Sequence, residues 1–366
     1  MIHFSNRNWL TNLYIFALLM IFLSGCGGSS NEGTHAGEMN TENLDIGVIK
    51  TDSGTEELDA GPIQEDMDFA DAEPVDIDAS VSQATGEVVV HRDLAYPPPN
   101  GEESDLAFLD IFRVDDAQTK PLVLLVHGGS WVSGDKQGYE SKIVPWWLSK
   151  GYVAAPINFR LASRLNQPLL VSPRDQARDI AAGLAWLIDQ ADLYHFDPEN
   201  IVILGYSSGA HLVALLGTDE TILREAGVNE THITATISFD VHAYDVPYAL
   251  GLMVGSVVED NMPLIRHLFG ETEAEQLSSS PINFVEGWAA KSLVISVDAD
   301  PEEVGSHGYI VSNTANRYIE ALREAGHQAE TFHDSEETHS SLVNGFGEQG
   351  DRVTEVVDRF IESLAP

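Results

Sequence analysis

Apolar positions follow two alternating patterns from about residue 87 to the end of the chain. Short apolar or alternating runs predict strands at residues 87–96, 106–114, 121–129, 152–161, 200–206, 233–241, 292–298 and 328–334. Between these runs, apolar residues recur every three or four positions and predict helices at 140–151, 172–196, 209–217, 313–326 and 351–364. Residues 241–290 follow neither pattern closely.

This order of elements predicts an α/β fold class. The first two strands are separated by the turn-forming segment 97–105, and we expect them to form an antiparallel pair. The later strands alternate with helices, which favours a mostly parallel central sheet flanked by helices. Ligands of such sheets bind beyond the carboxyl ends of the strands, so residues that directly follow strands are the candidates for chemistry.

Residues 1–86 have a different composition from the rest of the chain. An apolar run at 13–23 is too short to span a bilayer, and it ends in Leu-Ser-Gly-Cys at 23–26. This tetrapeptide resembles the lipobox of bacterial lipoproteins, in which the cysteine is lipidated. Residues 27–86 carry 15 acidic side chains against one basic one. The segment has too little apolar surface to offset the conformational entropy that folding would cost it.

We therefore expect three parts in the chain. They are a lipoprotein signal peptide at 1–25, an acidic disordered tether with lipidated Cys26 at 26–86, and a catalytic domain at 87–366. The expected location is the bacterial cell envelope, with the domain held outside the cytoplasm by a lipid anchor in a membrane.

Charge and cysteine content exclude several classes of function. The formal net charge of −39 argues against general binding to nucleic acid. A single cysteine excludes an intrachain disulfide and a cysteine-based metal site. No group of histidines and carboxylates has convincing metal-ligand spacing, and we expect neither a metal nor another cofactor. The oligomeric state is left open.

The segment Gly-Tyr-Ser-Ser-Gly at 205–209 lies between a predicted strand and a predicted helix. In that context G-x-S-x-G is typical of the nucleophile elbow of α/β-hydrolases, where the strand and helix approach too closely for side chains. Only Ser207 occupies the central position. Ser208 would contribute its backbone N–H to an oxyanion hole, together with the Gly128–Gly129 amides of His-Gly-Gly-Ser-Trp at 127–131.

A nucleophilic serine needs a base, and the base needs an acid that orients it. In this fold the acid and the histidine follow late strands, in that order along the chain. Asp298 and Asp300 are the two candidates for the acid. His339 is favoured as the base over His333, because His333 falls at the end of a predicted strand and His339 in the loop beyond it.

From about residue 105 onward the chain resembles the esterases of the hormone-sensitive-lipase-like and BD-FAE (feruloyl-esterase-like) branches of the α/β-hydrolases. The matching stretches are collinear and lie at 125–136, 151–162, 178–187, 196–212, 268–284, 294–304 and 338–361. The resemblance implies Ser207 as nucleophile, His339 as base and Asp300, the aspartate before a proline, as acid. It implies hydrolysis of a small-molecule or polysaccharide-linked carboxylic ester. The chain has Ser-Val-Asp at 296–298 where relatives have His-Gly-Asp, which keeps Asp298 open as the acid.

Other interpretations remain beside the esterase. An arylformamidase or another amide-cleaving hydrolase would use the same residues, and a retired hydrolase scaffold could serve only for binding. Ser133 and Lys136 match the S-x-x-K pattern of penicillin-recognising enzymes, but the companion motifs are missing from the chain. His127 and His211 are expected to pack within the fold and not to act as bases.

Overall fold

The computed structural model describes residues 86–101, 104–298 and 302–364. The predicted signal peptide, Cys26, the tether up to residue 85 and the candidate acid Asp300 lie outside these residues. In the described part, no helix has both the length and the apolar character needed to cross a membrane.

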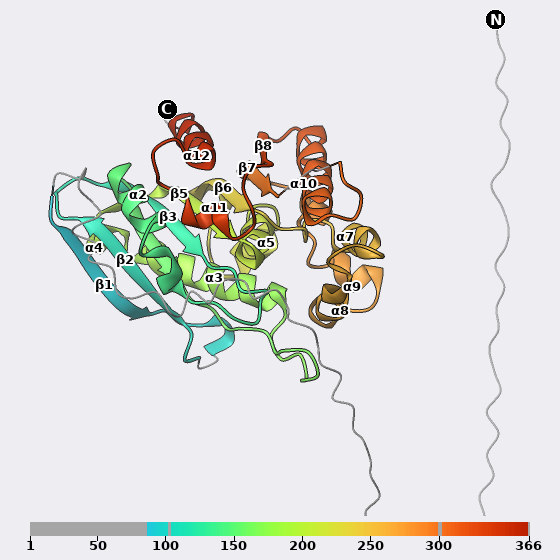
Figure 1. Cartoon of the computed structure of the whole chain (residues 1–366). Coiled ribbons are helices and arrows are strands. Elements are labelled where there is room, and N and C mark those ends of the chain that lie inside the picture. Colours follow the sequence, from blue (N-terminus) through green and yellow to red (C-terminus); the bar gives the residue numbers. More distant parts are fainter. Residues whose placement is uncertain (1–85, 102–103, 299–301, 365–366) are drawn as a thin grey trace, which may run out of the picture. The chain divides into compact units, whose positions relative to one another are not determined.

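The described residues form an eight-stranded sheet in the order β1-β2-β4-β3-β5-β6-β7-β8 (Figure 1). The strands are β1 (Val88–Ala95), β2 (Phe108–Val114), β3 (Lys120–Val126), β4 (Val153–Ile157), β5 (Phe196–Tyr206), β6 (Ile233–Phe239), β7 (Lys291–Val297) and β8 (Ala329–Asp334). β2 pairs antiparallel with β1 and with β4, and every other neighbouring pair is parallel. The predicted α/β fold with an N-terminal antiparallel pair is confirmed.

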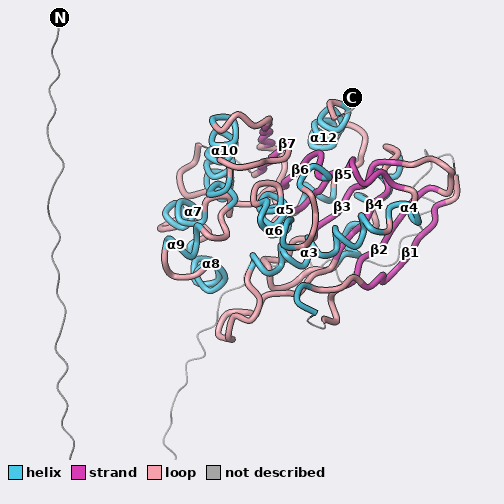
Figure 2. Tube along the Cα trace, turned by 180° about the vertical axis from the view of Figure 1, so that it is seen from behind, coloured by secondary structure: helices cyan, strands magenta, loops and turns pink. Residues whose placement is uncertain are grey.

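Helices cover both faces of this sheet (Figure 2). One face carries α3 (Pro173–Asp189), α5 (Ser208–Leu216), α6 (Glu220–Glu225), α7 (Val246–Met253), α8 (Met262–Phe269) and α10 (His307–Glu324). The other carries α2 (Ile143–Ser149), α11 (Ser341–Asn344) and α12 (Arg352–Glu362). Two short helices complete the set, α4 (Ala191–Tyr194) and α9 (Glu273–Leu277).

The central strands are buried on both faces, as their continuous apolar runs require. Leu124 of β3 belongs to the core under α3 and α5, whereas its neighbours Val123 and Leu125 belong to the core under α2 and α12. Strand side chains alternate between faces, so a strand of this kind needs apolar residues at every position. This double burial fixes the carboxyl ends of the strands, from which the candidate site is built.

Local signals explain most helix ends and one difference from the prediction. Ser172 caps α3 by accepting from the Asp175 N–H, and Pro173 occupies the first turn. The predicted helix at 172–196 is instead two helices, because α3 ends at Asp189 and α4 ends where His195 takes a left-handed conformation with φ of 58°. The chain then enters β5 at Phe196, four residues before the predicted start at 200.

The irregular segment 241–290 contains α7, α8 and α9 joined by short turns. Figure 1 shows these helices gathered beside α10, beyond β7. They follow β6 directly and therefore stand next to the carboxyl ends of the strands.

Candidate active site

Ser207 lies at a sharp turn between β5 and α5, as the elbow motif predicts. Its φ is +53° and ψ −126°, a strained combination for a residue with a side chain. A Cβ on Gly205 would lie 2.3 Å from the Gly209 carbonyl oxygen, and one on Gly209 would lie 2.2 Å from the Val126 oxygen. Both positions therefore require glycine for the strand and helix to approach. The Ser207 N–H donates to the Phe239 carbonyl at 2.8 Å, which ties the turn to the end of β6.

His339 lies in the loop between β8 and α11, and its Nε2 is 3.2 Å from the Ser207 Oγ. The Tyr206 hydroxyl donates to the His339 backbone carbonyl at 2.9 Å and so holds this loop against the elbow. The structure does not bring His333 to the serine. That side chain belongs to β8, and its Nδ1 is 2.9 Å from the Ser296 hydroxyl.

The carboxylate beside His339 comes from Asp240, a residue that the sequence reasoning missed. Its Oδ2 accepts from the His339 Nδ1 at 2.6 Å, and its Oδ1 accepts from the Val297 N–H at 2.9 Å. Burial alone would raise the pKa of Asp240, but the hydrogen bond from His339 and the nearby positive charge of the histidines hold that pKa below its usual value. Asp240 is therefore placed to stay ionised and to orient the imidazole.

This arrangement puts Asp240, and not Asp298, beside His339, and Asp300 stays a prediction. Asp298 contacts a different histidine, with its Oδ2 3.2 Å from the His307 Nδ1, and Asp300 lies outside the described residues. The physical reason is the strand order, because β6 is a direct neighbour of β5 and its carboxyl end therefore lies nearer to Ser207 than that of β7. The signal was present in the sequence as an aspartate that immediately follows the apolar strand 233–239.

The predicted oxyanion loop lies beside the nucleophile. Gly128 follows β3, and a Cβ on it would come within 3.0 Å of the Ser207 Cβ. The Gly129 carbonyl accepts from the Val132 and Ser133 N–H groups, which closes a tight turn. Ser208, the first residue of α5, lines the same cavity as Ser207. Whether the Gly128, Gly129 and Ser208 amides act on a substrate oxygen stays a prediction.

Two histidines near the elbow are structural in this fold. His127 is buried, stacks on Phe159, and donates from Nδ1 to the Gly128 carbonyl. His211 is fully buried in α5, where its Nδ1 accepts from the Trp131 indole and its Nε2–H donates to the Ser279 carbonyl. Burial lowers the pKa of His211 to about 4, so it stays neutral near pH 7.

The S-x-x-K pattern also has a structural role. The Lys136 ammonium is nearly inaccessible and donates to both oxygens of buried Asp110 at 2.9 Å and to Asp93 at 2.8 Å. Ser133 donates its hydroxyl to the Gly129 carbonyl. Neither side chain therefore serves as a second nucleophilic pair.

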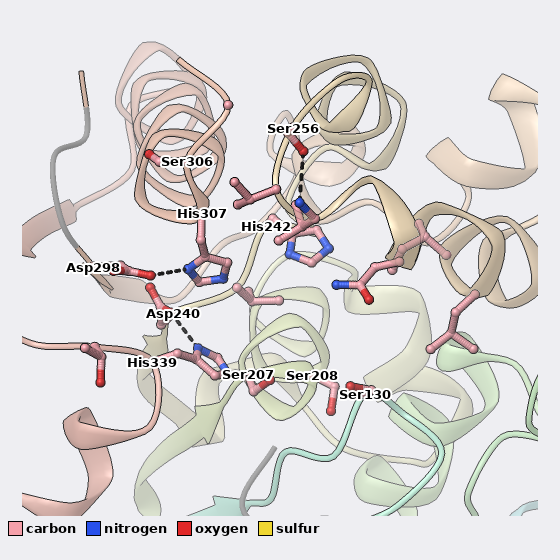
Figure 3. Close-up of a pocket in the computed structure, with 18 of the residues that line it drawn as sticks. Ser130, Ser207, Ser208, Asp240, His242, Ser256, Asp298, Ser306, His307 and His339 are labelled. Atoms are coloured by element: carbon pink, nitrogen blue, oxygen red, sulfur yellow. Dashed lines mark hydrogen bonds and ion pairs between the residues drawn. The ribbon is translucent and has the colours of Figure 1, made fainter. Parts of the chain in front are cut away.

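A cavity of about 880 Å³ opens above Ser207 and His339 (Figure 3). Its walls come from the oxyanion loop, from the 255–265 segment before and within α8, and from residues 303–307 at the start of α10. Three carboxylates line it, those of Asp240, Asp298 and Glu303, and none of the described lining residues is Lys or Arg. The cavity can hold an organic substrate against the serine, and its wall charge is negative.

A second histidine stands at the same centre. His307 begins α10, and its ring centroid lies 5.5 Å from that of His339 in an edge-to-face arrangement. One ligand atom from each of Asp240, His307 and His339 falls within 4.8 Å of the others. We expected no such cluster from the sequence, because the three residues are far apart in the chain.

Comparison with known proteins agrees with this geometry. The BD-FAE family model matches residues 109–305, more than half of the chain. Esterase LipQ of Mycobacterium tuberculosis is 24% identical over 274 residues, which cover 72% of this chain and 60% of LipQ. A probable isoprenylcysteine alpha-carbonyl methylesterase of Oryza sativa is 26% identical over 64% of this chain and 54% of its own length. The chain thus spans less than two thirds of both relatives.

Among solved structures, esterase B from Lactobacillus rhamnosis superimposes with a TM-score of 0.58. The match covers 79% of this chain and 90% of that protein at 18% identity. At this identity the likeness supports the fold only, which is the α/β-hydrolase fold that the described sheet also shows.

Proposed function

The chain belongs to the BD-FAE family of α/β-hydrolase esterases, and on that premise we propose that it hydrolyses carboxylic esters through Ser207, His339 and Asp240. The observation that carries the proposal is the continuous chain of contacts from the Ser207 Oγ to the His339 Nε2, and from the His339 Nδ1 to Asp240. In the tautomer that these contacts favour, Nδ1–H donates to the carboxylate and Nε2 accepts from the serine hydroxyl.

The chemistry follows from this arrangement. The Ser207 Oγ attacks the ester carbonyl while the His339 Nε2 takes its proton, and Asp240 stabilises the imidazolium that forms. The same imidazolium then gives the proton to the leaving alcohol, which leaves an acyl group on Ser207. Water, activated by the same histidine, releases the acid. Each amide of the Gly128, Gly129 and Ser208 set that reaches the tetrahedral oxyanion would contribute about 3 kcal/mol of transition-state stabilisation.

Labelling with a fluorophosphonate probe tests the nucleophile directly. We expect the wild-type protein to label and Ser207→Ala to remain unlabelled. Ser208→Ala is the matched control, since it removes the adjacent hydroxyl and keeps the backbone N–H, and it should label like the wild type. A wild-type protein that never labels would contradict the proposal and favour a binding module.

Hydrolysis assays test the substrate class. We expect turnover of nitrophenyl acetate and butyrate, and of acetylated or feruloylated sugars if the natural ester is linked to a polysaccharide. N-formylkynurenine serves as the amide comparison. Activity confined to this formamide would replace the esterase by an arylformamidase with the same three residues.

We also propose that the domain is held at a bacterial membrane through a lipid on Cys26. Support comes from the apolar run at 13–23, the Leu-Ser-Gly-Cys sequence that ends at Cys26, and the acidic segment that follows. An alkyne fatty acid fed to expressing cells should label the wild-type protein, which should sediment with membranes. Cys26→Ser should lose the label and the sedimentation, and an unlabelled wild type would refute the anchor.

A further inference from the structure

We propose that Asp240, His307 and His339 form a binding site for a divalent transition-metal ion, with Zn²⁺ as the best match, and that the bound ion switches the hydrolase off. The binding claim depends only on the geometry of this cluster. The inhibitory claim rests on the proposed esterase function of Ser207 and His339.

The ligand atoms are suitable in type and lie close together. One atom from each side chain lies within 4.8 Å of the other two, which gives two imidazole nitrogens and one carboxylate oxygen. Zinc sites with an open position commonly use three protein ligands of this kind, at about 2.0–2.2 Å from the metal. The cluster faces the cavity, where water or substrate can supply the fourth ligand.

A further carboxylate, that of Asp298, lies beside a histidine of the cluster, as carboxylates commonly do beside metal-binding histidines. Asp298 lies 3.2 Å from the His307 Nδ1, as an ion-pair contact without the direction of a good hydrogen bond (Figure 3). A carboxylate on one ring nitrogen of a histidine favours the proton there and leaves the other nitrogen free for a metal. In the metal-bound state, a small rotation of the Asp298 carboxylate would turn this contact into a hydrogen bond and hold His307 with Nε2 as the ligand atom, a role that the triad itself does not need.

The charge around the cluster also favours a cation. Asp240, Asp298 and Glu303 line the cavity, and the described lining residues include no Lys or Arg. A divalent ion at the cluster would be partly neutralised by Asp240 and attracted by the other two carboxylates.

Binding would inactivate the base by changing its tautomer. In the active state the single imidazole proton of His339 sits on Nδ1, toward Asp240. Coordination of Zn²⁺ by the Nδ1 lone pair moves this proton to Nε2, so no proton is gained or lost overall. Nε2 then presents N–H to the Ser207 Oγ and cannot accept its proton. The Nδ1 to Asp240 separation of 2.6 Å must open to about 3.3 Å for two tetrahedral zinc ligands, which a side chain carried by a loop can provide.

Direct titration tests the site without any need for activity. The full chain with Ser207→Ala is titrated with Zn²⁺ by isothermal calorimetry, and we expect one saturable site. Adding His307→Ala should weaken binding at least tenfold, and adding Asp298→Asn should weaken it about tenfold. His232→Ala is the matched control, because His232 also lies 3.1 Å from a carboxylate, Glu199, but at the opposite end of the strands. It should leave the affinity unchanged.

Inhibition is then measured on the catalytically intact chain, with each rate normalised to that variant's own rate in EDTA. Zn²⁺ should inhibit ester hydrolysis reversibly, and His307→Ala should require at least tenfold more metal for half inhibition. Absence of saturable binding up to about 1 mM Zn²⁺, or equal affinity after His307→Ala, would overturn the metal site. Zinc binding by a protein that hydrolyses no ester would instead support the site and refute the proposed function.

Discussion

The exchange of Asp240 for asparagine is the sharpest test of Asp240 as the acid. Both carboxylate oxygens are used, one by the Val297 N–H and the other by the His339 Nδ1–H. Asparagine keeps the size of the side chain but has only one oxygen. That oxygen should stay on the Val297 N–H, because the amide NH₂ group would oppose this donor. The NH₂ group then faces His339 and forces its Nδ1 to become the acceptor.

The size of the effect follows from that tautomer. With Nδ1 as acceptor, the imidazole proton sits on Nε2, and the base has no lone pair for the Ser207 proton. A serine triad locked in the wrong tautomer loses about 10⁴ in kcat, which is about 5 kcal/mol of transition-state stabilisation. Asp298→Asn removes the same charge from the end of the next strand, where the carboxylate lies beside His307, so we expect a loss of at most about tenfold, or about 1.4 kcal/mol.

The assay is kcat for nitrophenyl butyrate, measured for Asp240→Asn, Asp298→Asn and Asp300→Asn side by side. Circular dichroism of each variant separates lost catalysis from lost folding. A larger loss in Asp298→Asn or Asp300→Asn than in Asp240→Asn would refute the placement of the acid after β6.

Three further predictions concern stability. The pKa of His211 is about 4 in the folded state and about 6.5 in the unfolded chain, so the unfolded state binds more protons below pH 6.5. Between pH 7 and pH 5, this residue should therefore lower the unfolding free energy measured in urea titrations by about 2 kcal/mol. His211→Asn should remove that pH dependence. Lys136→Met should cost about 3–5 kcal/mol because it removes the ammonium that bonds both oxygens of the buried Asp110 carboxylate and leaves it only the partly exposed Arg92 at 3.5 Å. Lys136→Met combined with Asp110→Leu should recover most of that loss, and a single variant as stable as the wild type would refute the reasoning. Gly205→Ala should lower the unfolding free energy by about 1–3 kcal/mol and also lower kcat, because the new Cβ would lie 2.3 Å from a backbone oxygen. Gly227→Ala is the control, because this glycine is exposed and has nothing near its Cβ, so only the smaller strain of its positive φ should destabilise the variant.

Local sequence patterns predict most of the fold and part of the candidate site. The elbow at Ser207 and the loop at Gly128 were found because each is a contiguous motif at the end of an apolar strand. His339 was found because chain order in this fold places the histidine after the last strand. These features depend on a few neighbouring residues, which is where sequence patterns are most informative.

Asp240 was missed as a candidate acid for a reason that lies in the order of the strands in the sheet. Asp240 and Asp298 both follow apolar strands, and the sequence does not tell which carboxylate reaches the loop that carries His339. Only the side-by-side packing of β5 and β6 and the Val297 N–H on Asp240 decide it. The cluster with His307 was missed for the same reason, because its members come from three separate elements.

The three residues of the proposed triad differ in how firmly the protein holds them. Ser207 and Asp240 belong to one hydrogen-bonded ladder, since the Ser207 N–H bonds Phe239 and the Asp240 N–H bonds Ile295. His339 reaches them from a loop, which the Tyr206 hydroxyl holds to the elbow and the Asp298 N–H holds to the end of β7 through the Glu337 carbonyl. Heating should therefore detach the histidine before the sheet melts, so that activity disappears reversibly some degrees below the unfolding transition. The thermal limit of the proposed activity would then be set by the attachment of this loop and not by the stability of the core.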